Sequence, residues 1–276
     1  MGDLCDPAFK IHHIASKNTP LRIIHTAACT DLFSSYDKMV EINVSAVVKL
    51  LSHPNVEFHH MSTMAILLYD NPEILCSPNR HASQIKQVAG TYAQTKWLAE
   101  WIGTQANAVI YRLGLLFSPN AVQPSPRNWF NKVIKGIIQL GMVPENTGHL
   151  RFDLCPIGHA AKEIIRNLNS RQSLLHIHRK KQLTLGELVQ QLREYGHPIA
   201  EVKSDTFIEA TWTHRHLPTV NAAHLAFARF IRTTNGADYH VSDLFLTSEY
   251  FLHPTETCYD GTLGLKEALK NIMKEP

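Results

Sequence analysis

The chain has 276 residues, of which 44% are apolar and 18% are charged, so it can bury a substantial core and disorder is not expected. The formal net charge is only +3 and the most basic stretch, residues 178–181, is short, so we expect no nucleic-acid partner. No apolar run is long enough to span a membrane, no secretory signal is evident, and the five cysteines form no CxxC pair. These features predict a cytoplasmic protein without a membrane partner.

Short β-rich runs alternate with helical patterns through the first two thirds of the chain, which is typical of a parallel sheet with crossover helices. Residues 65–90 contain two prolines and no clear period, so we predict a long loop there, and loops of that length are usually functional. The pattern turns mostly helical from Thr184 onward. In chain order, the predicted elements are strand 21–25, helix 35–52, strand 56–62, helix 91–105, strand 108–113, helix 129–140, a connection at 153–157, helix 158–169 and strand 174–178.

Seventeen histidines raise the question of a metal site. His176 and His178 share one face of a predicted strand, and His214 and His216 would do so if their segment were extended. Neither pair has a third ligand at a recognisable spacing, so we predict no metal site and interpret these side chains as structural or surface histidines.

The most informative motif is Tyr92-Ala-Gln-Thr-Lys96, within the predicted helix 91–105. Residues four apart share one helix face, and only one of the eight tyrosines has a lysine at that spacing. A nearby ammonium favours the phenolate and lowers the pKa of a tyrosine, so such a pair can exchange a proton with a substrate oxygen. The spacing alone is equally compatible with a surface helix that happens to carry both residues.

The predicted strand ends add context to this motif. Thr63 follows strand 56–62, in which alternation places His59 and His60 on opposite faces. The carboxyl ends of parallel strands form the ligand-binding edge of a sheet, where a hydroxyl can hydrogen-bond a carbonyl oxygen. The alternative is that Thr63 caps a turn or helix.

Two further features lie upstream. The small residues Thr26, Ala27 and Ala28 follow strand 21–25, where they let a cofactor approach the backbone or simply allow a strand to pack closely on a helix. Asn43 is a polar residue in an otherwise apolar helix, and we expect it to be a core amide bonded to a neighbouring loop.

These features occur in the order found in extended short-chain dehydrogenases, which carry an HxAA-like turn, an N-V helix motif, a strand that ends in S-S/T, and Y-x-x-x-K. Within that group the chain most resembles the thioester reductases, which are the reductive release domains of nonribosomal peptide synthetases, carboxylic acid reductases and related enzymes. The likeness runs from about residue 2 to about residue 205. The segments that carry it are HTAA, FHHMST, YAQTKWLAE, YRLGLLF, IKGIIQLGMVPE and FDLCPIGHAAKEII.

The resemblance implies three catalytic residues: Thr63, Tyr92 and Lys96. It implies a set of residues at the cofactor: Thr26, Ala27, Ala28, Asn43, Tyr92, Lys96, Leu113 and Gly114. In these roles Thr63 holds the substrate carbonyl, Tyr92 donates the proton, and Lys96 lowers the pKa of Tyr92 and bonds the nicotinamide ribose. Asn43 supports the site from behind. Leu113 stands where the family usually has the proline of R-P-G.

The implied reaction is the NAD(P)H-dependent reduction of an acyl thioester to an aldehyde or alcohol. The implied cofactor is NADPH, with NADH as the alternative, and the acyl group would be carried by a carrier protein or coenzyme A. Two other interpretations stay open. One is another extended short-chain dehydrogenase, such as a sugar-nucleotide epimerase or dehydratase or a hydroxysteroid-type oxidoreductase. The other is a non-catalytic, truncated remnant or binding module.

One departure from the family pattern concerns the cofactor. Neither G-x-x-G-x-x-G nor G-x-G-x-x-G occurs in the chain, although the family has this phosphate-binding loop and its first strands before the position of Gly2. We favour a fragment of a longer reductase as the explanation. A separately encoded N-terminal piece and a decayed gene product are the alternatives.

The expected fold class is therefore α/β, with a Rossmann-like parallel sheet that lacks its first strands. We expect an incomplete NAD(P)-binding domain over residues 1–180, with a substrate-side insertion at about 119–149. Residues 181–276 are expected to form a mostly helical region that caps the substrate.

Overall fold

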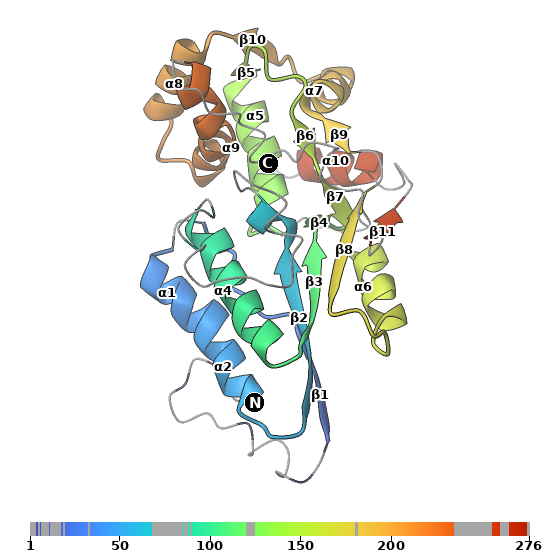
Figure 1. Cartoon of the computed structure of the whole chain (residues 1–276). Helices are drawn as coiled ribbons and strands as arrows, with labels where there is room; N and C mark the ends of the chain where they lie inside the picture. Colours follow the sequence, from blue (N-terminus) through green and yellow to red (C-terminus); the bar gives the residue numbers. More distant parts are fainter. Residues whose placement is uncertain are drawn as a thin grey trace. The chain divides into compact units, whose positions relative to one another are not determined.

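The chain folds into two compact units in a computed structural model (Figure 1). The first comprises Met1–Gly114, Ala160–His178 and Phe251–Thr257, and the second comprises Leu115–His159, Arg179–Tyr250 and Cys258–Pro276. The residues that the structure describes are 20–32, 34–67, 90–119, 125–179, 182–234, 256–259 and 265–274, with single positions at Leu4, Asp6, Ile11, Asn18, Ile85 and Val88.

A five-stranded sheet in the order β1-β2-β3-β8-β11 forms the centre of the first unit. β1 pairs with β2, β2 with β3 and β3 with β8, all in parallel, which confirms the predicted α/β class and Rossmann-like sheet. The strands are β1 (Leu21–His25), β2 (Val56–Thr63), β3 (Val109–Leu113), β8 (Leu174–Arg179) and β11 (Glu256–Tyr259).

The helix predicted at residues 35–52 contains a π-helical turn in its middle. It consists of α1 (Tyr36–Val40), the π-helical segment η2 (Glu41–Ser45) and α2 (Ala46–Leu51). Single π-helical turns within α-helices are frequent at functional sites, and this one contains Asn43.

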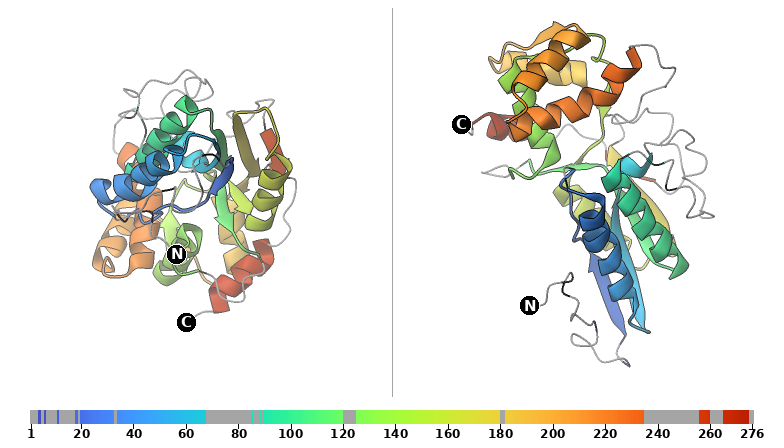
Figure 2. Two further views of the ribbon diagram at one scale, coloured as in Figure 1. Left: turned by 90° about the horizontal axis from the view of Figure 1, so that it is seen from below. Right: turned by 90° about the vertical axis from the view of Figure 1, so that its left-hand side faces the viewer.

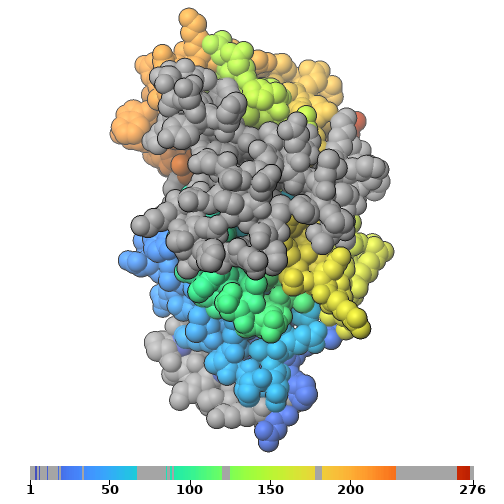
Figure 3. Space-filling view, viewed as in Figure 1, coloured from blue at the N-terminus to red at the C-terminus, as the bar shows by residue number. Residues whose placement is uncertain are grey.

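The other helices of the first unit are η3 (Met64–Leu67), a 3₁₀ turn, α4 (Thr91–Gln105) and α6 (Ile157–Arg166). The bounds of α4 are those predicted. The loop predicted at 65–90 begins with η3, and most of its remainder lies outside the described residues. Figures 1 and 2 show α2 and α4 side by side on one face of the sheet and α6 on the other. The outward sides of α2 and α4 lie at the surface in Figure 3, and Val48 on α2 is half exposed.

Successive side chains of β2 point to opposite faces of the sheet, and the two faces have different surroundings. Phe58 points toward the helices, where it joins a core with Val47, Leu50 and Ala99. His60 faces the same side, as its contact with Lys96 of α4 shows. The prediction that His59 and His60 point to opposite faces is therefore confirmed.

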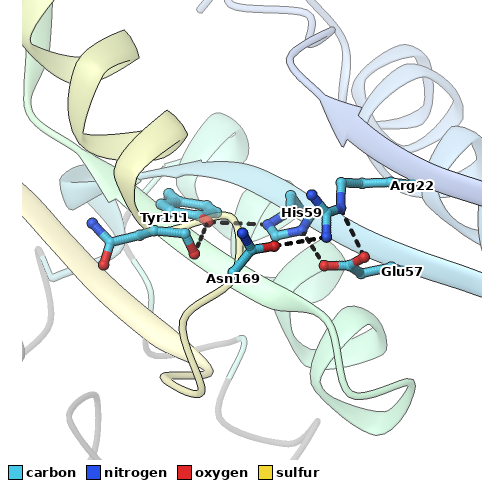
Figure 4. A network of polar contacts seen from close by, with 6 residues as sticks. Arg22, Glu57, His59, Tyr111 and Asn169 are labelled. Atoms are coloured by element: carbon cyan, nitrogen blue, oxygen red, sulfur yellow. Dashed lines mark hydrogen bonds and ion pairs between the residues drawn. The ribbon is translucent and has the colours of Figure 1, made fainter.

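The other face of the sheet carries a polar network (Figure 4). His59 contacts the Tyr111 hydroxyl through Nδ1 (3.0 Å) and Glu57 Oε1 through Nε2 (3.1 Å). Arg22 of β1 extends the network, because its guanidinium donates to Glu57 Oε2 at 2.7 Å and to Asn169 Oδ1 at 2.9 Å.

The second unit combines helices with three short strand pairs. β4 (Leu115–Phe117) pairs with β7 (Leu154–Pro156) and β5 (Met142–Pro144) with β10 (Ala200–Val202), both in parallel. β6 (Arg151–Phe152) pairs with β9 (Leu183–Thr184) in antiparallel fashion. The helices are α5 (Trp129–Leu140), α7 (Leu185–Glu194), α8 (Ser204–Thr213), α9 (Pro218–Thr234) and α10 (Leu265–Lys274). α5 has the predicted bounds, and the described residues after Thr184 are mostly helical, as predicted.

The histidine pairs considered as metal ligands lie in different kinds of secondary structure. His176 lies on β8, where its Nε2 is 3.3 Å from Arg112 Nη1. His214 is the C-cap of α8, so the assumption that His214 and His216 lie on an extended segment is wrong. Within the described ranges, no group of three His, Cys, Asp or Glu residues is placed to hold a metal ion. None of the helices described is both long and apolar enough to cross a membrane.

The close packing of α5 on α9 gives a test of the fold. A Cβ at Gly136 would lie 2.2 Å from the main-chain oxygen of Thr219. We expect Gly136→Ala to lower the free energy of unfolding by about 1–3 kcal/mol, because the two helices must move apart. Urea denaturation of the purified chain measures the change. Gly158→Ala is the control, since a Cβ there meets nothing within 4 Å, and an equal loss in both variants would contradict this packing.

Candidate active site

The predicted site residues gather at one edge of the sheet in the first unit, because parallel strands present their carboxyl ends on the same side. Thr63 is the last residue of β2 and lies opposite Leu113, the last residue of β3. Gly114 follows directly and donates its N–H to the carbonyl of Ile177 at 3.1 Å. The main chain that leaves β1 begins with Thr26 and Ala27, which are both exposed, and continues with the partly buried Ala28.

The start of α4 brings the helix to this edge. Gly90 precedes the helix with a φ of +80°, a conformation that side chains with a Cβ rarely adopt, and its carbonyl accepts from the N–H of Gln94 at 3.0 Å. Tyr92 lies in the first turn, and Lys96 lies one turn further on, where it is buried. The helix spacing that the sequence indicated therefore aligns both side chains along one helix face.

Tyr92 and Thr63 are brought together. Burial raises the pKa of Tyr92 to about 12, while a hydrogen bond from the Thr63 side chain acts in the opposite direction. The Thr63 hydroxyl also accepts from the N–H of Ala65 at 3.1 Å, so it caps the turn after β2 as well. The two interpretations of Thr63, a turn cap and a site hydroxyl, are thus compatible in one geometry.

Lys96 has different partners from those expected. Its ammonium donates to the carbonyl oxygen of Met61 at 2.5 Å and contacts Nε2 of His60 at 3.3 Å. Burial lowers the pKa of Lys96 to about 8, and the nearby carboxylate of Glu100 opposes this effect in part. The expectation that Lys96 lowers the pKa of Tyr92 is wrong for this structure, because burial dominates at the phenol and the ammonium is bound to β2.

Asn43 is the core amide that the sequence predicted. Its Oδ1 accepts from the N–H of Cys29 at 2.7 Å, and its Nδ2 donates to the carbonyl of Cys29 at 3.2 Å and to Thr95 Oγ1 at 3.1 Å. The side chain therefore connects the loop after β1 to α4. This contact fixes the main chain of residues 26–29 relative to the helix that carries Tyr92 and Lys96.

Two buried groups behind the site were missed by the sequence analysis. One is the pair of histidines His25 and His60, which contact each other through their Nδ1 atoms at 3.2 Å. The other is the ion pair between Arg112 of β3 and Glu100 of α4, in which Arg112 Nη2 donates to Glu100 Oε2 at 2.9 Å. A charged residue within an otherwise apolar strand was the one available signal for Arg112, and its partner on another element could not be identified from spacing.

Comparison with known proteins places this geometry in a family. Residues 2–164 match the male sterility protein family of NAD-binding domains. The large subunit of L-2-aminoadipate reductase from Eremothecium gossypii is 24% identical over 133 residues, which cover 44% of this chain and 9% of that protein.

Two solved structures share the fold over 99% of this chain. One is a thiolation-reductase di-domain from an archaeal nonribosomal peptide synthetase, with a TM-score of 0.68, 20% identity and 61% of that chain covered. The other is the terminal R domain of the myxalamid PKS-NRPS pathway, with a TM-score of 0.73, 15% identity and 73% of that chain covered. The chain thus spans a small part of its curated relative and about three fifths of the first structure.

The match covers more than half of the sequence, and the parallel sheet with Tyr92 and Lys96 on one helix agrees with it. This chain therefore belongs to the male sterility protein family of NAD-binding domains.

Proposed function

We propose that this chain reduces an acyl thioester to an aldehyde, with NADPH as the reductant and Thr63, Tyr92 and Lys96 as the catalytic residues. The observation that carries the proposal is the meeting of three groups at the carboxyl edge of the sheet. A protonated phenol lies beside a strand-end hydroxyl, and a buried ammonium lies one helix turn away. Such a set can bind a carbonyl oxygen and supply a proton to it.

The residues around the edge fit a nicotinamide cofactor. Thr26 and Ala27 are small and exposed, so they leave the main chain after β1 open to a ribose or phosphate, and Lys96 has a third N–H donor beyond the two used in the fold. Leu113 and Gly114 at the end of β3 would lie beside the nicotinamide. When bound, the cofactor would supply the hydride to the carbonyl carbon.

The catalytic side chains would then bind the carbonyl oxygen and transfer the proton. Thr63 would hold the carbonyl oxygen, and Tyr92 would donate its proton as negative charge develops there. With a pKa of about 12, Tyr92 stays protonated at neutral pH, which suits a proton donor in a reduction. Lys96 would bind the nicotinamide ribose through an N–H that Met61 and His60 do not use. The C–S bond of the tetrahedral product would break, and the sulfur would leave as a thiol while the carbon becomes an aldehyde. A second reduction would give an alcohol.

The substrate class is supported by the fold of the whole chain. The likeness to two reductase domains extends through the mostly helical second unit, and one of those structures includes a thiolation domain. We propose that the helical region caps the acyl chain and that a carrier protein or coenzyme A delivers it. Another extended dehydrogenase, acting on a sugar nucleotide, is the alternative that a substrate screen would identify.

A second candidate is a non-catalytic module that does not bind a nucleotide. Titration of the chain with NADPH separates the two. Quenching of the protein fluorescence that saturates at micromolar NADPH supports the reductase. Fluorescence that is unchanged up to millimolar NADPH supports the non-catalytic module.

The role of Tyr92 predicts the effect of its substitution. We expect Tyr92→Phe to slow acyl-thioester-dependent oxidation of NADPH by about 10²-fold or more, because the proton donor is lost while the ring is kept. The change in absorbance at the NADPH band measures the rate. Tyr36→Phe is the control, since Tyr36 is an exposed tyrosine of α1 and the rate should stay at the wild-type level. Undiminished activity in Tyr92→Phe would show that the assignment is wrong.

The pKa of Lys96 predicts how the rate of thioester reduction depends on pH. Its pKa of about 8 means that the ammonium is present below pH 8 and is lost as the pH rises through that value. We therefore expect kcat/KM for the thioester to fall on the alkaline side with a midpoint of about pH 8. Lys96→Arg should remove this limb, because a guanidinium keeps its charge. An alkaline limb that persists at the same midpoint in Lys96→Arg would contradict the assignment.

A further inference from the structure

A chain of buried polar groups connects β1, β2 and α4 behind the proposed site. His25 Nδ1 is 3.2 Å from His60 Nδ1, and His60 Nε2 is 3.3 Å from the ammonium of Lys96. His60 has no exposed surface, and His25 and Lys96 are only 4% and 2% exposed. Both ring nitrogens of His60 thus have a partner, as a buried polar group requires, whereas Nε2 of His25 is buried without a hydrogen-bond partner among the described residues.

The direction of each hydrogen bond follows from the chemistry of Lys96. An ammonium has donors and no acceptor, so Nε2 of His60 must accept from it. A neutral His60 then carries its proton on Nδ1 and donates to Nδ1 of His25, which leaves the proton of His25 on Nε2. Both histidines are neutral, because burial and the charge of Lys96 lower the pKa values of His25 and His60.

We propose that His60 is a positioning residue for Lys96. Its Nε2 and the carbonyl of Met61 hold two of the three N–H donors of the ammonium, and the third, which has no acceptor within the described part of the chain, is assigned to a ligand. His25 fixes the tautomer of His60 that can accept from Lys96. The identity of that ligand rests on the proposed function, whereas the contact between His60 and Lys96 does not.

The surrounding rings hold His60 in this orientation. Its ring stacks on His25 with centroids 5.3 Å apart and on Phe58 with centroids 6.2 Å apart. The titratable groups of the described elements that interact with Lys96 are His25 of β1, His60 of β2 and Glu100 of α4. Glu100 is bound by Arg112 of β3, so its carboxylate is shared with another cation, whereas His60 is a neutral side-chain acceptor in direct contact with Lys96.

The proposal predicts the pKa of Lys96 in three variants of His60. A hydrogen bond to the charged form favours that form, so its loss lowers the pKa of the lysine further. Asn places its amide near the Nδ1 position of His60 and Gln near the Nε2 position, so only Gln keeps an acceptor for Lys96. We expect His60→Asn and His60→Phe to lower the pKa of Lys96 by about one unit. His60→Gln should stay within a few tenths of wild type.

The measurement is a pH titration of the ¹³Cε signal of Lys96 in the full chain labelled with [¹³C]lysine, assigned by its absence in Lys96→Met. The wild-type midpoint is expected at about 8. His59→Phe is the matched control, because His59 is equally buried on the same strand but faces Tyr111 and Glu57. Its midpoint should equal that of the wild type.

A His60→Asn midpoint equal to that of wild type would overturn the proposal, as would a His60→Gln midpoint as low as that of His60→Asn. If His60→Phe fails to fold, the difference in the Lys96 midpoint between His60→Asn and His60→Gln still tests the proposal. The titration needs neither cofactor nor substrate, so it is independent of the proposed function. If the variants show the predicted midpoints but the chain does not oxidise NADPH, the contact between His60 and Lys96 is supported and only the proposed reductase function is wrong.

Discussion

The arrangement of the site depends on one requirement, which is that the buried ammonium of Lys96 must find acceptors. It finds them on β2, at the carbonyl of Met61 and at His60, and this ties α4 to the carboxyl half of that strand. Because Tyr92 lies one turn before Lys96, the same contact brings the phenol to the end of β2, where Thr63 lies. Asn43 adds a second link, from α4 to the loop after β1.

The two faces of the sheet show how neighbouring residues acquire different roles. His59 and His60 are adjacent and both buried, yet His59 joins a polar network with Tyr111 and Glu57, whereas His60 contacts the lysine of the proposed site. On the face that carries His60, the ion pair of Arg112 and Glu100 joins β3 to α4 with both side chains fully buried. Removing one partner of such a pair typically costs about 3–5 kcal/mol, since the other charge is then left without compensation.

Much of this fold follows from periodicity in the sequence. The bounds of α4 and α5 and the parallel strands β1 to β3 were predictable, because helix and strand periods are local properties. The meeting of Tyr92 and Thr63 followed from the rule that parallel strands share a carboxyl edge. The partners of Lys96 and Arg112 could not be predicted in this way. They are a main-chain carbonyl, a histidine and a carboxylate on other elements, and such groups do not recur at a fixed spacing in the sequence. The π-helical turn at Asn43 was likewise hidden within a regular apolar stripe.

The proposed reaction requires that a thioester carbonyl binds at the edge where Tyr92 and Thr63 meet. A crystal structure of the chain with NADPH and an unreactive acyl amide, in which nitrogen replaces the thioester sulfur, tests it most directly. We expect the amide oxygen to lie at hydrogen-bond distance, about 2.6–3.2 Å, from both the Tyr92 and the Thr63 hydroxyl oxygens. An amide bound away from this edge, or one whose oxygen contacts neither hydroxyl, would contradict the account.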